Sequence, residues 1–201
     1  MRSILAAILV LSTLLPEAFP QAQKKIGVEL KAPIVAAQFD LQDVRLLAGP
    51  LKEVLERNQQ YLLSLEVDRL VHNFRINAGL PSNAQPLGGW ETPNCELRGH
   101  FTGHYLSACA LMFASTGDIR VKEKGNQVVD ALAGCQHTLG SSGYLSAYPE
   151  TFIDRVENGK WVWAPYYTLH KIMVGLLDMY MLCDNKQALE VAKGMASWVK
   201  K

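Results

Sequence analysis

Four long stretches of the sequence repeat apolar residues every three or four positions, and this pattern constrains the fold more than any other feature. Such spacing places the apolar side chains on one face of an α-helix. We expect helices at about 96–115, 119–137, 166–183 and 186–201. A further helix is expected to start at Pro50, since proline suits a first turn, and to continue to about Phe74. The sequence therefore predicts an all-α fold.

The connections between these helices alternate between short and long. Tight turns follow Thr116 and Cys183, whereas residues 140–163 form a long polar and aromatic segment with room for one short strand at Gly143 to Tyr148. This order indicates stacked helical hairpins, as in a solenoid or an (α/α)6 toroid. The 166–183 helix is apolar nearly all round, so we expect it to be buried. No polar closing helix follows, and we expect the toroid to be incomplete in this chain.

The first residues carry a targeting pattern. Met1 and Arg2 precede an almost wholly apolar run from Ile4 to Leu15, which Pro16 ends. A run of about a dozen residues is too short to cross a bilayer core of about 30 Å. We interpret residues 1–23 as a secretory signal peptide, 24–38 as an extended leader and 39–201 as the folded part. The protein is then secreted or periplasmic, with no membrane segment after cleavage.

Composition narrows the possible partners. Charged residues make up 19% and the net charge is +1, which argues against a nucleic-acid binder and suits a neutral substrate. The four cysteines form no C-x-x-C pair, so a zinc knuckle is not favoured. We expect Cys109, Cys135 and Cys183 to be small core residues, while Cys95 lies in a polar loop. The disulfide state of all four is left open.

The densest polar and aromatic segment is GGWETPNCELRGHFTGHY, residues 88–105. If the helix starts near Glu96, then Glu96, His100 and His104 lie on one face. This stripe has three interpretations. A metal site is disfavoured because no His-Glu-x-x-His is present. A sugar site, with Trp90 for stacking, and a structural role for the two histidines both remain open.

A second aromatic group follows the long loop. Trp161, Trp163, Tyr166 and Tyr167 lie within seven positions, and His170 comes next. Each aromatic residue alone is a common core residue, but together they favour a pocket wall. Paired carboxylates are the usual glycosidase machinery, and the candidates are Glu91, Glu96, Glu150 and Asp154. Spacing selects no pair among them, and a loop or capping role is the alternative for each.

Several long motifs give the sequence a resemblance to a known family. NFRINAGL, LGGWETPNCELRGHFTGHYLSACALMFASTGD, GYLSAYPE and VWAPYYTLHKIMVGLLDMY resemble the N-terminal part of the β-L-arabinofuranosidase-like family, glycoside hydrolase family 127. The similarity covers roughly Phe39 to Lys201. It implies an (α/α)6 catalytic domain and a secreted glycoside hydrolase acting on terminal arabinofuranoside bonds of a plant-type glycan. The oligomeric state is left open.

The resemblance also implies where the chemistry lies. Family members use a cysteine nucleophile, a zinc ion held by a glutamate and three cysteines, and a glutamate acid, all in motifs after the matched region. We therefore expect no catalytic residue and no zinc ligand in this chain, which alone would be inactive. His170 matches a family histidine that contacts the sugar. The other substrate-binding candidates, inferred from their chemistry, are His100, His104, Trp90, Glu96, Tyr166 and Tyr167.

Two other functions stay open at this stage. Another toroid enzyme, such as a polysaccharide lyase, could use Tyr166, Tyr167 and His170 in place of cysteine and zinc. A non-catalytic helical module that binds carbohydrate, or a scaffold with no ligand, is also compatible with the sequence.

Overall fold

The structure is a computed structural model that describes residue 36 and residues 38–200. The predicted signal peptide lies outside the described residues, and so does nearly all of the predicted leader. The chain divides after Asp40 into two compact units, and the features below belong to the second, which starts at Leu41. All regular elements of the described part are helices, so the short strand considered at Gly143 to Tyr148 is not formed there. No helix in this part is long and apolar enough to cross a membrane.

The N-terminal helical region is broken where the sequence predicts one helix. A 3-10 turn, η2 (Leu41–Asp43), precedes α1 (Pro50–Ser64), α2 (Val67–Leu70) and α3 (His72–Asn77). Leu65 has extended backbone, with φ −72° and ψ 128°, and interrupts the predicted continuous helix. Leu51 and Val54, two apolar residues of α1, are both exposed. The C-terminal part of α1 contacts α4, because the Tyr105 hydroxyl of α4 donates to the Leu62 carbonyl of α1 at 2.8 Å.

Two helical hairpins follow and agree with the predicted order. The first is α4 (His100–Thr116) with α5 (Ile119–Leu139), and the second is α7 (Pro165–Cys183) with α8 (Lys186–Val199). Gly117 takes φ 74° in the first tight turn, and the Asp118 side chain then accepts from the Arg120 amide at 3.0 Å. Asn185 caps α8 in the same way, with the Ala188 amide at 2.9 Å. Side-chain caps of this kind stabilise the start of the following helix.

The long connection between the hairpins is not without structure. It contains α6 (Thr151–Glu157), a short helix that was not predicted. Arg98, just before α4, holds this connection because its Nε donates to the Ala147 carbonyl at 2.8 Å and its guanidinium lies over the Phe152 ring.

Helices α4 and α7 are parallel and touch through their backbones. A Cβ atom on Gly103 would lie 2.2 Å from the Lys171 carbonyl oxygen, and one on Gly175 would lie 2.3 Å from the Gly103 carbonyl oxygen. The contacts advance in the same direction on both helices, because Gly99 lies against Thr168 and the Ser107 hydroxyl donates to Asp178 at 2.5 Å. Glycine at the crossing therefore allows an approach that a side chain would prevent.

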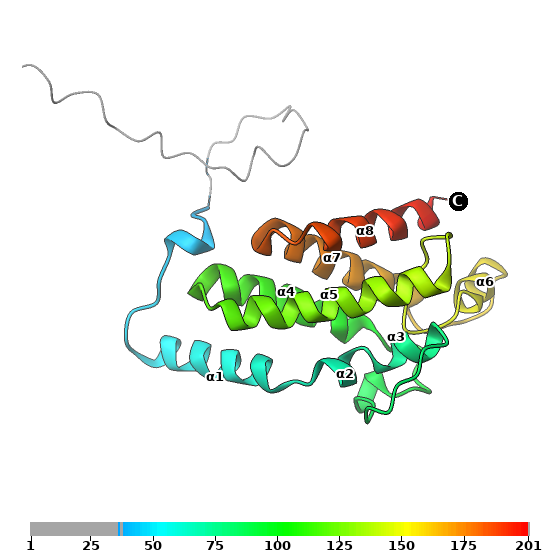
Figure 1. Ribbon diagram of the computed structural model, residues 1–201, viewed down its shortest axis with the longest axis horizontal. Coiled ribbons are helices and arrows are strands. Elements are labelled where there is room, and N and C mark those ends of the chain that lie inside the picture. The colour runs from blue at the N-terminus through cyan, green and yellow to red at the C-terminus, as the bar shows by residue number, and fades with distance from the viewer. Residues whose placement is uncertain (1–35, 37, 201) are drawn as a thin grey trace, which may run out of the picture. The chain divides into compact units, whose positions relative to one another are not determined.

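The returning helices α5 and α8 also run parallel to each other. Asn185 Nδ2 donates to Asn126 Oδ1 at 2.7 Å, and Gln136 Nε2 donates to the Val191 carbonyl at 3.0 Å, near the other end of the pair. Figure 1 shows the long helices lying side by side, with α1 on the side of the α4–α5 hairpin that is opposite to α7 and α8. Helices that alternate in direction between two layers are what the sequence predicted for part of an (α/α)6 toroid.

The buried side chains agree with the predicted core, but the exposure of one helix, α7, differs from the prediction. Cys109, Cys135 and Cys183 are buried in the core, as predicted, and all three are free thiols. The prediction that α7 is buried all round is wrong, because Tyr166, Tyr167, Leu177 and Met181 are each 39–44% exposed. The core side of α7 consists of residues at helical spacing, namely Leu169, Ile172, Gly175, Leu176, Met179 and Cys183.

Candidate functional site

The start of α4 is displaced from the predicted position, and this changes which side chains share a face. Residues 96–99 form turns, and the helix begins at His100. Gly99 has φ 101°, and a Cβ there would lie 2.7 Å from the Ala147 Cβ. The backbone therefore turns sharply at a position where only glycine fits. Glu96 lies before this turn and is not part of a helical stripe with His100 and His104, contrary to the prediction.

Glu96 instead holds the connection before α7. Its carboxylate accepts from Arg155 Nη1 at 2.8 Å and from the Trp163 amide at 3.0 Å. Although desolvation opposes the effect, these two hydrogen bonds keep the pKa of the Glu96 carboxyl below its usual range. The contacts describe an ionised carboxylate that fixes Trp163, which follows Glu96 by 67 residues.

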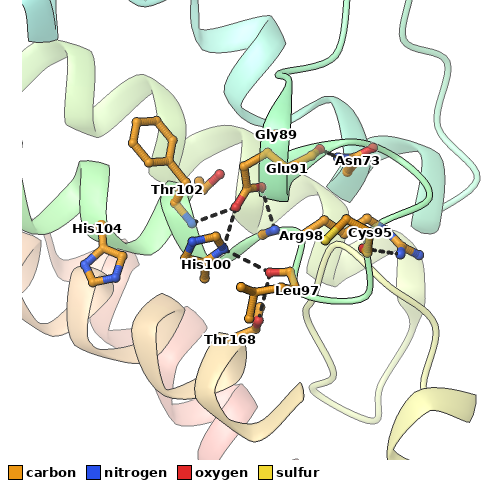
Figure 2. A network of polar contacts seen from close by, with 12 residues as sticks. Asn73, Gly89, Glu91, Cys95, Leu97, Arg98, His100, Thr102, His104 and Thr168 are labelled. Carbon is orange, nitrogen blue, oxygen red and sulfur yellow. Dashed lines mark hydrogen bonds and ion pairs between the residues drawn. The ribbon is translucent and has the colours of Figure 1, made fainter. Parts of the chain in front are cut away.

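Glu91 is the buried carboxylate of this region, and it organises the first turn of α4 (Figure 2). It belongs to a 3-10 turn, η3 (Gly89–Glu91). Its Oε2 accepts from the Gly99 amide at 2.6 Å, and its Oε1 accepts from the Phe101 amide at 2.9 Å and lies 2.7 Å from His100 Nδ1. Burial raises the pKa of Glu91, and the two amides and His100 oppose this rise.

Five aromatic side chains meet at the N-terminal end of α4 and just before and within the first turn of α7. We call Trp90, His100, His104, Trp163 and Tyr167 the ring cluster. The His100 ring centroid lies 6.3 Å from that of Trp90, 6.0 Å from that of His104 and 6.1 Å from that of Tyr167. Trp163 meets Trp90 edge-on at 6.0 Å. These centroid distances are those of interacting aromatic rings.

The ring cluster combines a buried side with an open side. His100 is buried, whereas Trp90 is 63% exposed and Tyr167 is 42% exposed. Open aromatic faces beside imidazole nitrogens can stack on a ligand and hydrogen-bond to it at the same time.

His104 and Tyr167 are joined directly. His104 Nε2 lies 3.2 Å from the Tyr167 hydroxyl, and the Lys171 ammonium lies 5.0 Å from the centre of the Tyr167 ring. Desolvation first, then the positive charge of Lys171, and last the neighbouring His100 ring lower the pKa of His104. A lowered pKa keeps this imidazole neutral near pH 7, so it can take part in hydrogen bonds without carrying charge.

The structure thus brings together four of the seven predicted substrate-binding residues, Trp90, His100, His104 and Tyr167. Tyr166 is directed elsewhere, because its hydroxyl bonds to Glu157, which raises the pKa of that phenol. His170 is exposed on α7, one turn beyond Tyr166 and Tyr167, and makes no ring contact with the cluster. Whether any of these residues binds a ligand stays a prediction.

Sequence reasoning did not select Glu91 or Lys171 for the site. Glu91 was weighed only as one of four carboxylates, with capping as an alternative, and capping is what it does.

The described residues provide no metal site. No group of three or more His, Cys, Asp or Glu side chains in that part of the chain is placed to hold a metal ion. The zinc implied by the resemblance therefore does not fit these residues. Burial raises the pKa of Cys109 to about 12 and those of Cys135 and Cys183 to about 11, so these thiols stay protonated and are poor nucleophiles.

Residues 43–201 match the family model described as β-L-arabinofuranosidase, GH127 catalytic domain. No curated protein matches the chain.

Proposed function

We propose that the ring cluster binds the sugar in a glycoside hydrolase, since this chain belongs to the GH127 β-L-arabinofuranosidase family. The match covers most of the chain and the whole of both helical hairpins. Membership of this family makes a glycosidic bond the target. The proposal adds a finer substrate, a terminal β-L-arabinofuranoside of a plant-type glycan.

The observation that carries the proposal is the composition of the ring cluster. Aromatic faces of Trp90 and Tyr167 can pack on the C–H groups of a furanose ring, and the two histidines offer nitrogen atoms to its hydroxyls. A neutral imidazole at His104 suits a neutral polyol, because hydroxyl groups exchange hydrogen bonds without needing a counter-charge. His170, one helical turn from Tyr167, is proposed as a further sugar contact on the same helix.

The proposal assigns binding and orientation, not bond cleavage, to this chain. The buried thiols are protonated, Glu96 is paired with Arg155, and both Glu91 oxygens accept hydrogen bonds from the backbone. As the family resemblance implies, we assign the nucleophile, the acid and any zinc to family motifs other than those matched within residues 43–201. Secretion, from the predicted signal at residues 1–23, is part of the same proposal.

Binding of methyl β-L-arabinofuranoside, measured by calorimetry with the α-anomer as comparison, tests the proposal. Trp90→Ala removes the most open ring of the cluster and should weaken binding about tenfold, which corresponds to about 1.4 kcal/mol. Trp161→Ala is the matched control, since Trp161 is 74% exposed in the neighbouring loop and has no ring contact with the cluster. Equal losses in the two variants, or no binding of any arabinofuranoside, would contradict the proposal. Binding without cleavage by the complete natural protein would instead favour a non-catalytic carbohydrate-binding module.

A further inference from the structure

The His100 ring is held by acceptors at one of its two nitrogens. Nδ1 lies 2.7 Å from Glu91 Oε1 and 3.0 Å from the Leu97 carbonyl oxygen (Figure 2). A carbonyl oxygen and a carboxylate can only accept hydrogen bonds. The proton of a neutral His100 must therefore be on Nδ1, shared between these two oxygens.

The other nitrogen of the ring, Nε2, has a different environment. It has no hydrogen-bond partner among the described residues, and the side chain that carries it is 11% exposed. In the Nδ1–H tautomer, Nε2 carries a lone pair and no proton. The ring that bears it lies among Trp90, His104 and Tyr167.

We propose that Glu91 is a positioning residue for His100, holding the Nδ1–H tautomer so that Nε2 is a fixed acceptor for a hydroxyl proton of the bound sugar. The identity of the ligand rests on the proposed function, whereas the tautomer rests on the Glu91 and Leu97 contacts alone. The second role of Glu91, accepting from the Gly99 and Phe101 amides, fixes the same carboxylate relative to the start of α4. One side chain thus sets both the helix start and the orientation of the imidazole.

Nitrogen NMR of the histidine rings in the full chain measures the tautomer directly. We expect a pyrrole-type ¹⁵N signal at His100 Nδ1 and a pyridine-type signal at Nε2, with ring proton couplings that assign Nδ1–H. A pyrrole-type signal at Nε2 would overturn the proposal without any variant being made.

Glu91→Ala tests whether the carboxylate is responsible. The Nδ1 proton then keeps only the Leu97 carbonyl as acceptor, and we expect it to exchange with water at least tenfold faster. Glu96→Ala is the matched control, because Glu96 is a carboxylate of the same segment that binds Arg155 and the Trp163 amide and should leave this exchange unchanged. If Glu91 were only a helix cap, exchange of the Gly99 and Phe101 amides would change while Nδ1–H exchange would not, and the proposal would fail.

Titration with methyl β-L-arabinofuranoside separates the tautomer from the ligand. Hydrogen bonding from a sugar hydroxyl should move the pyridine-type Nε2 signal in the unsubstituted protein and move it less in Glu91→Ala. An Nε2 signal that keeps the expected tautomer and ignores every arabinofuranoside would support the positioning by Glu91 and refute the sugar as its purpose.

Discussion

The backbone contact between α4 and α7 predicts that one glycine-to-alanine change destabilises the protein. In Gly103→Ala the new Cβ would lie 2.2 Å from the Lys171 carbonyl oxygen and 2.6 Å from the Ile172 amide nitrogen. Both neighbours are backbone atoms of a helix, so they cannot rotate away as a flexible side chain would. An ordinary contact needs at least 3.4 Å, so the two helices must separate by about 1 Å.

Two opposing free energies decide the size of the effect. Alanine stabilises a helix interior by about 1 kcal/mol relative to glycine. Overpacking costs about 1–3 kcal/mol, and a clash between two backbones belongs at the upper end of that range. We therefore expect Gly103→Ala to lower the free energy of unfolding by about 2 kcal/mol, which lowers Tm by about 4–8 °C.

Gly134→Ala is the matched control. Gly134 lies in the interior of α5, and a Cβ there would meet nothing within 4 Å. The same substitution should raise the free energy of unfolding by about 1 kcal/mol, because only the helix preference remains. Denaturant unfolding followed by circular dichroism measures both variants. Effects of equal sign in Gly103→Ala and Gly134→Ala would refute the reasoning.

Three other outcomes are expected. The 201-residue chain should release no sugar from an arabinofuranoside with or without added zinc, as an assay of released reducing sugar would establish. A thiol reagent at pH 8 should label the half-buried Cys95 well before Cys109, whose pKa is raised to about 12, and faster labelling of Cys109 would contradict its burial. The folded pKa of His104 is lowered, so the unfolded chain binds its proton first and stability should fall as the pH drops through about 6.5. Between pH 7 and 5 this slope should be smaller in His104→Gln, and an unchanged slope would count against the lowered pKa.

Features that depend on nearby residues could be predicted from the sequence. The stops at Gly117 and Gly140, and the cap by Asp118 after the first tight turn, rest on backbone and side-chain preferences that act over a few positions. The helix ends there agree closely with the structure. The buried cysteines were also predictable, since each follows the apolar period of its own helix.

Features that depend on distant residues could not be predicted. The turn before α4 needs glycine at position 99, because Ala147, in the connection after α5, occupies the space that a side chain there would need. The helical period alone therefore extended α4 back to Glu96. In the same way, the carboxylate of Glu91 reaches His100 only after residues 92–99 have folded back. No local pattern distinguishes it from Glu96, which points toward Arg155 instead.

The parallel course of α4 and α7 has an electrostatic consequence. Each helix carries a partial positive charge at its N-terminus, equivalent to about half an elementary charge. Because α4 begins at His100 and α7 at Pro165, both positive ends lie beside the ring cluster. The two macrodipoles act in the same sense there and disfavour added positive charge, the same direction in which the pKa of His104 is moved. A neutral hydroxyl compound meets no penalty in this field, whereas an amino sugar carrying an ammonium group would bind against it.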